Sequence, residues 1–254
     1  MIRDALGRSF SFDQAPCRVV SLVPSLTETL FDLGAGDSVV GITDFCIFPP
    51  GIDRPRVGGT KDPGLEIIRG LRPDLVHMNL EENLKRHADQ IYAFAPLFVT
   101  EPKTVGDVSA LITTLGTIHD RRERASELVR ELDDALANAA HQPFTFACPI
   151  WKQSWMWCGG DTYVSSLVEA AGGTNVLGSR KRYPSVSVEE IASMKPDIIF
   201  LPDEPYVFTH TDATELRDST AAQIVGPFPG HLFTWHGSRT ILGLRFLAGV
   251  GGSR

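Results

Sequence analysis

The sequence lacks several features that would place it in a common class. Its four cysteines, Cys17, Cys46, Cys148 and Cys158, form no C-x-x-C pair, so we expect neither a zinc ribbon nor a disulfide framework but free, mostly buried thiols. No apolar run reaches the roughly 18 residues of a membrane-spanning helix. The first residues lack the apolar core of a signal peptide, which predicts a cytoplasmic protein or one whose leader was removed.

Catalytic motifs are also missing. The sequence contains no Walker loop, no G-x-S-x-G, no H-E-x-x-H and no glycine-rich dinucleotide signature. Ser25 at a strand–helix turn, with His236 elsewhere, would suit a hydrolase, but the glycines of a nucleophile elbow are absent. The net charge of −7 argues against nucleic acid as a partner. We therefore expect neither an enzyme nor a nucleic-acid-binding protein.

A long amphipathic segment lies at the centre of the chain, from Asp120 to His141. Its apolar residues follow the i, i+3, i+4, i+7 spacing of a helix with one buried stripe: Ala125, Leu128, Val129, Leu132, Ala135, Leu136 and Ala139. Asp120, with Glu123 three residues on, is a candidate N-terminal cap, and Gln142-Pro143 ends the pattern. The segment predicts a helix about 30 Å long, the width of a small domain.

The two sides of this helix repeat one design. Residues 65–76, LEIIRGLRPDLV, match residues 188–199, VEEIASMKPDII, position for position. In the same order, 30–41 parallels 167–178, since both run from an apolar helix end through glycines to a V-x-G sequence. The repeat predicts two related, Rossmann-like α/β lobes with small parallel sheets. Their expected bounds are an N-terminal lobe 1–118, a connecting helix 119–142 and a C-terminal lobe 143–254.

Local patterns place the elements inside each lobe. Apolar and β-branched runs predict strands at 18–23, 39–42, 74–78, 97–100, 144–150, 198–201 and 231–235. Helices are expected at 64–71, 82–94 and 104–118, and residues 188–199 repeat the pattern of a helix followed by a strand. Ser25 and Glu28 resemble a capping box that opens a helix to Leu33, and Asp161 is expected to cap a helix to Ala171.

The loops that follow the strands are aromatic in both lobes and predict a ligand cleft between them. Relative to its counterpart, the second lobe inserts residues 151–160, with tryptophans at 151, 155 and 157. Exposed indoles are costly in water, so the ligand or a facing loop is expected to cover them. The candidate ligand-binding residues are Ser25, Phe45, Phe48, Trp151, Trp155, Trp157, Tyr183, Tyr206, Trp235 and Arg239.

Simpler interpretations stay open for these residues. The tryptophans could roof the core of the second lobe, and the other aromatics could be core residues. A basic set could hold an anionic ligand or form a solvated rim: Lys152, Arg180, Lys181, Arg182 and Arg239. No metal-ligand spacing links His210, His231, His236, Cys46 and Cys158, so no metal site is expected, although one histidine could contact a chelated metal axially.

The motif series resembles a known family. Gly7-Arg8, the run from Arg18 to Glu28 (RVVSLVPSLTE), Gly34, Val40-Gly41 and Phe48-Pro49-Pro50 are similar to the ABC-importer substrate-binding proteins for cobalamin, iron–siderophores and haem. The similarity is greatest to the cobalamin-binding branch and covers nearly the whole chain. Thr60 and Asn79 stand where that branch carries aromatics, so the aromatic contacts must come from elsewhere, notably residues 151–157.

The resemblance implies a fold and a function. The fold is the class III periplasmic-binding-protein fold, in which two lobes are joined by a single long helix. The ligand is a metal chelate, with cobalamin first and a ferric siderophore or haem second, and no intrinsic cofactor is expected. Glu66 and Glu189 match the acidic residues that dock onto the ABC permease. A monomer in the periplasm or on the cell surface is implied, and a cytoplasmic sensor or enzyme of the same fold is the alternative.

Overall fold

The computed structural model describes residues 2–139 and 143–250, and the chain divides into two compact units. Unit 1 comprises Met1–Pro102 and Val108–Arg130, and unit 2 comprises Lys103–Asp107 and Glu131–Arg254. The division falls inside helix α5 (Arg122–Ala139), which therefore runs from unit 1 into unit 2. The bounds 1–118, 119–142 and 143–254 stay a prediction, and the expected end of the helix lies outside the described residues.

Unit 1 is built on a parallel sheet with the strand order β4-β3-β5-β6. The strands are β3 (Val19–Ser21), β4 (Val39–Ile42), β5 (Leu75–Asn79) and β6 (Leu97–Thr100). Most of their residues are buried, as expected for a parallel sheet covered on both faces. These strands confirm the elements predicted for the first half of the chain.

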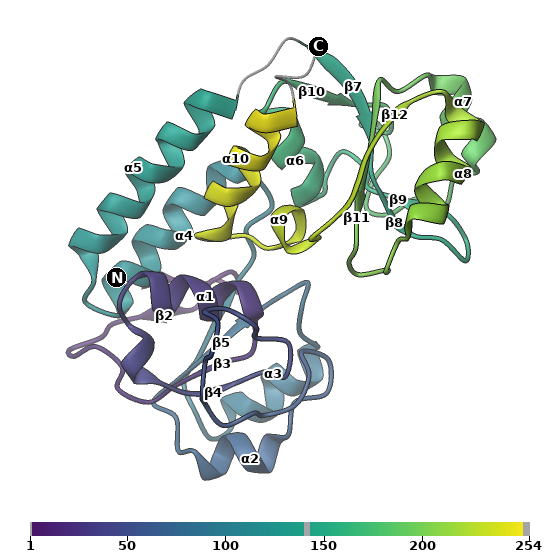
Figure 1. Cartoon of the computed structure of the whole chain (residues 1–254). Coiled ribbons are helices and arrows are strands. Elements are labelled where there is room, and N and C mark those ends of the chain that lie inside the picture. The colour runs from purple at the N-terminus through teal and green to yellow at the C-terminus, as the bar shows by residue number, and fades with distance from the viewer. Residues whose placement is uncertain (1, 140–142, 251–254) are drawn as a thin grey trace. The chain divides into compact units, whose positions relative to one another are not determined.

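Successive side chains of a strand point to opposite faces of the sheet, so unit 1 has core residues on both faces. Val20 and Val76 pack with Ile68 of α2 (Leu65–Gly70) and Ile91 of α3 (Lys85–Tyr92), whereas Val19 packs with residues of α1 (Pro24–Asp32). Figure 1 shows α1 on one side of this sheet and α2 and α3 on the other. A short antiparallel pair, β1 (Ile2–Arg3) and β2 (Ser9–Phe10), precedes the sheet.

Unit 2 repeats this arrangement with the strand order β10-β7-β11-β12. The strands are β7 (Phe144–Ala147), β10 (Gly173–Asn175), β11 (Ile198–Pro202) and β12 (Gln223–Phe228). The helices α7 (Val188–Met194) and α8 (His210–Thr220) cover one face, and α6 (Tyr163–Ala170), α9 (His231–Thr234) and α10 (Arg239–Val250) cover the other (Figure 1). The shared strand order confirms the internal repeat.

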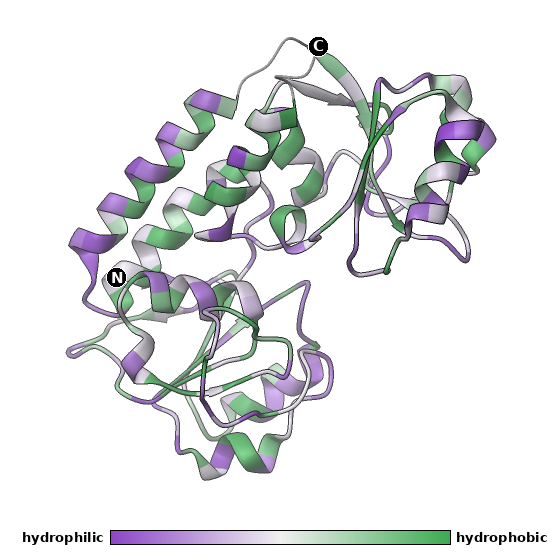
Figure 2. Cartoon of the chain, viewed as in Figure 1, coloured by the Kyte–Doolittle hydropathy of each residue, from purple (hydrophilic) through white to green (hydrophobic). Residues whose placement is uncertain are grey.

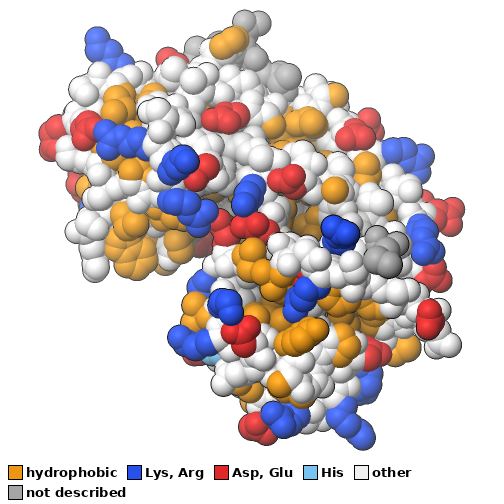
Figure 3. Space-filling view, turned by 180° about the vertical axis from the view of Figure 1, so that it is seen from behind, with side chains coloured by type: hydrophobic (Ala, Val, Ile, Leu, Met, Phe, Trp, Pro, Cys, Tyr) orange, Lys and Arg blue, Asp and Glu red, His pale blue; other side chains and the backbone are white. Residues whose placement is uncertain are grey.

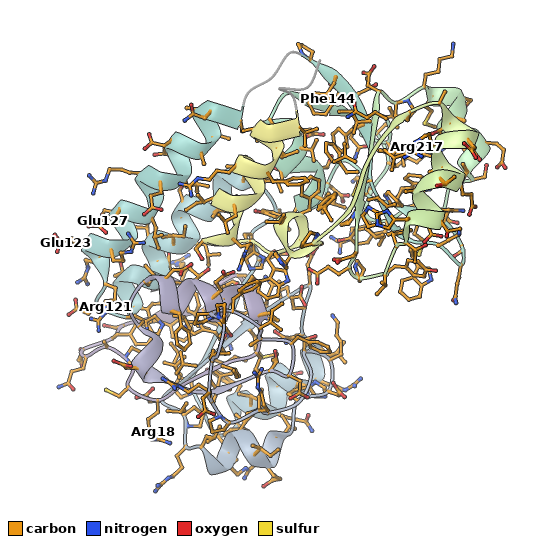
Figure 4. The ribbon with its side chains drawn as sticks, in the orientation of Figure 1. Arg18, Arg121, Glu123, Glu127, Phe144 and Arg217 are labelled. Carbon is orange, nitrogen blue, oxygen red and sulfur yellow. The ribbon has the colours of Figure 1, made fainter. Side chains whose placement is uncertain are left out.

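The repeat extends to individual interactions. The Asp74 carboxylate accepts hydrogen bonds from the backbone N–H groups of Cys17 and Arg18, and the Asp197 carboxylate accepts from the N–H and hydroxyl of Thr145. Each aspartate thereby joins the amino ends of two neighbouring strands. Arg18, labelled in Figure 4, also donates to the carbonyl oxygen of Leu71 at 2.6 Å.

The helix ends that precede these aspartates also match. Arg72 and Lys195 occupy equivalent positions and both adopt left-handed backbone conformations, with φ of 47° and 52°. A left-handed residue commonly ends a helix and turns the chain toward the next strand. The shared turn explains why L-R-P-D and M-K-P-D recur before the two strands.

The second part of the predicted repeat is shifted by one residue. Val39 of β4 pairs with Val19, and the equivalent pair in unit 2 is Asn175 of β10 with Phe146, whereas the repeat matched Val39 with Val176. Unit 1 inserts a short 3₁₀ turn, Gly36–Ser38, between the helix and β4, and in unit 2 the strand starts directly after Gly172. The two V-x-G sequences are therefore offset by one residue at Val39.

The last predicted strand, 231–235, is also wrong. Residues 231–234 form the short helix α9, and the edge strand is β12, which pairs with β11 in parallel. The N–H groups of Phe233 and Thr234 bond back to the carbonyl oxygen of Gly230, which closes the helical turn. An apolar run too short to show a period cannot distinguish strand from helix.

Three predicted caps differ in the structure. Helix α1 begins at Pro24, so Ser25 lies inside its first turn and forms no capping box. Thr162, not Asp161, caps α6, and its hydroxyl accepts from the N–H of Ser165. Asp120 has a left-handed conformation (φ 53°) after α4 (Val105–Ile118) and ends that helix instead of capping α5.

Helix α5 keeps the predicted amphipathic pattern. Leu128 and Leu132 are buried, as are Ala125, Ala135 and Ala139, while charged residues occupy the other side (Figure 2). Figure 4 labels Glu123 and Glu127 on the charged side of α5. Among the described helices, none combines the length and the apolar character that crossing a bilayer would take.

Candidate functional site

The loops that leave the carboxyl ends of the strands carry most of the predicted ligand residues. In unit 2, β7 is followed by the antiparallel pair β8 (Pro149–Trp151) and β9 (Met156–Trp157), and β11 is followed by the loop 203–209. In doubly wound folds, ligands bind at this edge of the sheet. Each unit's carboxyl edge is therefore the place to look for a site.

Five aromatic side chains lie together at the carboxyl edge of unit 2 and form what we call the aromatic cluster: Trp151, Trp155, Trp157, Tyr206 and Phe208. The Trp151 and Tyr206 rings meet edge to face at 5.3 Å, and Tyr206 contacts Phe208 at 4.8 Å. Trp155 stacks on Phe208 at 5.9 Å and on Trp157 at 5.6 Å. Such stacked and edge-to-face pairs are favoured by the ring quadrupole.

The side chains of the aromatic cluster differ in how much of their surface is exposed. Trp157 is completely buried and its indole N–H donates to the carbonyl oxygen of Val186 at 2.9 Å, whereas 38% of Trp151 is exposed. Trp155 and Tyr206 are half-buried. The expectation that Trp157 is an exposed residue covered by ligand is therefore wrong, because its own unit covers it.

Lys152 fixes the cluster to helix α8. Its ammonium group bonds to the carboxylates of Asp212 at 2.5 Å and Glu215 at 2.6 Å and lies 5.7 Å from the Trp155 ring centre. Hydrogen bonds to Asp212 and then Glu215 raise the pKa of Lys152. Two carboxylates already pair with this charge, so Lys152 connects the aromatic cluster to helix α8.

A second segment braces the pair of strands from its other side. The backbone of residues 155–160 exchanges hydrogen bonds with residues 180–186, as in the bond from Trp157 N–H to the Pro184 carbonyl oxygen. Gly160 is required here, because a Cβ at this position would lie 2.1 Å from the carbonyl oxygen of Gly178. Tyr183 lies half-buried in this segment, with the Arg182 guanidinium 5.5 Å from its ring.

A polar group follows β11 and β12 at the same edge of unit 2. Burial raises the pKa of Glu204, although Thr234 and Trp235 donate hydrogen bonds to its carboxylate. The distance from Thr234 Oγ1 to Glu204 Oε1 is 2.6 Å. The buried Arg239 guanidinium lies 6.0 Å from the Trp235 ring centre. Trp235 and Arg239 are thus neighbours, as a joint ligand role requires, and Glu204 is a member that the sequence did not suggest.

Unit 1 presents fewer aromatics at its carboxyl edge. Phe45 is 58% exposed and Phe48 is half-buried, and both lie in the loop after β4. Arg56 holds this loop by donating to the carbonyl oxygens of Thr43 and Cys46 at 2.7 and 2.9 Å. Ser25 is buried in the first turn of α1. Phe45 is therefore the predicted residue of unit 1 most available to a ligand.

Asn83 is a positioning residue of this edge that sequence reasoning missed. Its amide nitrogen donates to the carbonyl oxygens of Leu22 and Thr60, and its amide oxygen accepts from the N–H of Asn79. One buried side chain thus ties the loops after β3, β4 and β5 together. The only signal in the sequence is a pair of asparagines four residues apart after a strand.

Glu66 and Glu189, the predicted docking residues, occupy equivalent positions in the first turns of α2 and α7. The Glu66 side chain is 85% exposed and lies 3.8 Å from Arg69, and Glu189 is also exposed. Hydrogen bonds from its own backbone N–H and from Ser187 lower the pKa of Glu189, which keeps the carboxylate charged. Each unit therefore presents one solvated acidic group on corresponding helices.

The remaining charged candidates are spread out. Among the described residues, no three His, Cys, Asp or Glu side chains are grouped to hold a metal ion. Arg180 is committed to an ion pair with Glu190. On the face drawn in Figure 3, basic and acidic side chains are interspersed among apolar ones. The candidate site therefore offers mainly aromatic contacts to a ligand, together with a few neighbouring polar groups.

Comparison with known sequences gives a family match and several relatives. The profile of the family described as periplasmic binding protein matches residues 19–223. A cobalamin-binding protein of Halobacterium salinarum is 27% identical over 245 residues, covering 88% of this chain and 62% of that protein. A vitamin B12-binding protein of Photorhabdus laumondii is 28% identical over 204 residues, covering 76% and 73%. The chain thus spans less than two thirds of the length of the Halobacterium salinarum relative.

Solved structures share the fold. The periplasmic vitamin B12 binding protein BtuF of Vibrio cholerae superposes with a TM-score of 0.75 at 19% identity, covering 94% of this chain and 99% of that chain. The periplasmic haem binding protein HutB of the same organism gives a TM-score of 0.79 at 17% identity, covering 92% and 98%. At these identities the likeness establishes the fold alone.

Proposed function

The chain belongs to the periplasmic binding protein family, and from that premise we propose that it captures a metal chelate and delivers it to an ABC importer. Cobalamin is the first candidate ligand, and a ferric siderophore or haem is the second. The curated relatives are named as cobalamin- or vitamin B12-binding proteins, which supports this order. The family consists of binding proteins, which favours transport over the enzyme alternative.

The observation that carries the proposal is the aromatic cluster at the carboxyl edge of unit 2. Trp151 and Tyr206 offer a partly exposed aromatic surface, which rests on half-buried Trp155 and on buried Trp157 and Phe208. A rigid aromatic surface contacts a large planar ligand with few torsions to freeze on binding. The polar groups of Glu204 and Arg239 at the same edge would supply orientation.

Binding of cobalamin to the purified protein tests the proposal. Cyanocobalamin titrated in a calorimeter should bind, and replacing Trp151 with Ala should weaken binding about tenfold or more, because a partly exposed aromatic anchor is lost. The melting temperature of the unliganded protein should change little, since 38% of Trp151 is exposed. Tyr92, 60% exposed on α3, provides the matched control Tyr92→Ala, which should leave affinity unchanged.

Haem and a ferric siderophore are titrated in parallel. If one of them binds and cobalamin does not, the order of ligands is reversed. Absence of binding by all three at micromolar protein and ligand would reject the capture of such a chelate.

We also propose that Glu66 and Glu189 dock onto cationic residues of the permease and that the protein works in the periplasm or on the cell surface. The support is their equivalence in the repeat, their exposure and the charge retained by Glu189. Carboxylates at helix starts are also favoured by the helix dipole, so exposure alone does not assign this role. The protein is expected to act as a monomer.

Charge reversal separates docking from ligand capture. The double variant Glu66→Lys/Glu189→Lys should lose most ligand uptake in vesicles that carry the cognate permease, because like charges would then meet across the interface. Its affinity for the ligand should equal that of the unaltered protein, since both residues are solvated. Charge reversal at Lys85 and Asp89, an exposed pair on α3, is the matched control. Unchanged uptake by the docking variant would contradict the assignment.

A further inference from the structure

Cys148 and Cys158 are brought together by the fold of unit 2. The β8–β9 register pairs Pro149 with Trp157, so Cys148 and Cys158 occupy the next opposing positions. The Cys158 N–H donates to the Cys148 carbonyl oxygen at 2.8 Å, which joins the two backbones directly. Opposing residues of antiparallel strands have Cα atoms about 4.5–5.5 Å apart. A disulfide spans Cα separations of about 4.4–6.8 Å.

The two thiols also face each other. Burial raises the pKa of Cys148, and the neighbouring Cys158 thiol, hydrogen-bonded to it, raises that pKa further. Both residues are completely buried, and both are free thiols in the structure. The other two cysteines differ, because Cys17 is exposed and Cys46 lies between the hydroxyls of Thr27 and Thr43. Among the cysteines, this pair therefore has the arrangement that a disulfide needs.

We propose that Cys148 and Cys158 form a disulfide when the chain folds in an oxidising compartment. Two thiols lose two protons and two electrons as the S–S bond forms, and a disulfide oxidant (an oxidase with a reactive disulfide, or oxidised glutathione) is reduced to two thiols. The folded protein shields both sulfur atoms, and a thiol with a raised pKa attacks slowly. The bond therefore forms during folding or through local opening of the β8–β9 pair.

The bond would fix the base of the segment that presents the aromatic cluster. Trp151, Trp155 and Trp157 all lie between the two cysteines in the sequence. Closing this loop restricts the unfolded chain and holds the two strands together next to Trp157. The inference concerns oxidation of the protein itself, so it stands or falls independently of which ligand the site takes.

Refolding in the presence of an oxidant tests the pair. The protein is unfolded in urea with a reductant and refolded with oxidised glutathione. It is then unfolded again in urea without a reductant, so that every free thiol is accessible, and treated with an alkylating agent before mass spectrometry. We expect two thiols to escape alkylation and peptide mapping to link Cys148 with Cys158. The variant Cys17→Ser/Cys46→Ser should behave identically, while all remaining thiols of Cys158→Ser should be alkylated. Oxidation should raise the melting temperature by about 5 °C or more.

The mapping on the unaltered protein decides the question even if a variant fails to fold. Refolded, compact protein in which all four cysteines remain alkylable would overturn the proposal. A link that involves Cys17 or Cys46 would overturn it as well.

Discussion

Replacing Trp157 with alanine is expected to lower the free energy of unfolding by about 3–5 kcal/mol, the usual cost of removing a large buried aromatic side chain. Trp157 is fully buried among the residues between the sheet of unit 2 and helices α7 and α8. The substitution also leaves the Val186 carbonyl oxygen without its indole donor. Trp155 loses its stacking partner at the same time.

Urea unfolding followed by circular dichroism measures this effect. Trp151→Ala is the matched control, because it removes the same side chain from a partly exposed position and should cost far less. Trp157→Phe should recover part of the stability by refilling the cavity without the hydrogen bond. A Trp157→Ala protein as stable as the Trp151→Ala protein would show that Trp157 is not a core residue.

Acidification is expected to destabilise the protein between pH 6.5 and about 4. Burial, followed by the positive charge of Arg121, lowers the pKa of His119 to about 4, and burial alone lowers the pKa of His236 to about 4. The unfolded chain, with histidine pKa values near 6.5, takes up protons first as the pH falls. Stability is therefore fully present above pH 6.5 and is lost progressively toward pH 4, by about 3 kcal/mol for each of these histidines.

The geometry in unit 1 adds to this loss. The Nε2 atoms of His77 and His119 lie 2.9 Å apart, so one hydrogen atom occupies the space between them. Burial, and then the charge of His119, lower the pKa of His77, because two imidazolium groups cannot share this contact. Protonation of one ring places a charge in a buried site, and protonation of both would also force two hydrogen atoms into this contact, so both steps oppose the folded state.

Unfolding free energies measured by urea titration at several pH values check this prediction. His236→Phe, which keeps a ring against Tyr163, should reduce the slope of stability against pH. A free energy of unfolding that stays constant from pH 6.5 to 4.5 would refute the assignment of these histidines as neutral core groups.

Much of the fold followed from repeated local patterns. The match between residues 65–76 and 188–199 predicted two equivalent helix–strand units, and the structure adds the reason in the paired roles of Asp74 and Asp197. Helix α5 was visible because a buried stripe runs along most of its length. Long periodic segments carry enough residues to define their own period.

The errors in predicted secondary structure arose in segments whose conformation depends on tertiary contacts. The segment His231–Trp235 has apolar and β-branched character, but Gly230 starts a helical turn there and β12 takes the sheet edge. Strand β12 contains Gly226 and Pro227, residues that normally argue against a strand and are tolerated at an edge. Helix α8 was missed because most of its residues are polar.

The sequence predicted which residue types make up the candidate site but not how deeply each of them is buried. The sequence showed that one inserted segment carries the tryptophans at 151, 155 and 157. The sequence could not show that Phe208 and Val186, from distant segments, share a core cluster with Trp157. Asn83 and Glu204 were missed because their partners are backbone atoms or residues far away in sequence.

The two aspartates at the amino ends of the strands have an evolutionary consequence. Asp74 and Asp197 secure each sheet at the edge opposite the loops that vary between the two halves. Insertions such as residues 151–160 therefore lengthen a loop without disturbing the hydrogen bonds that hold neighbouring strands in register. After a duplication, one half could acquire tryptophans while the other kept a plain turn at Pro24. Such a division allows the loops at the carboxyl edge to change while the sheets stay constant.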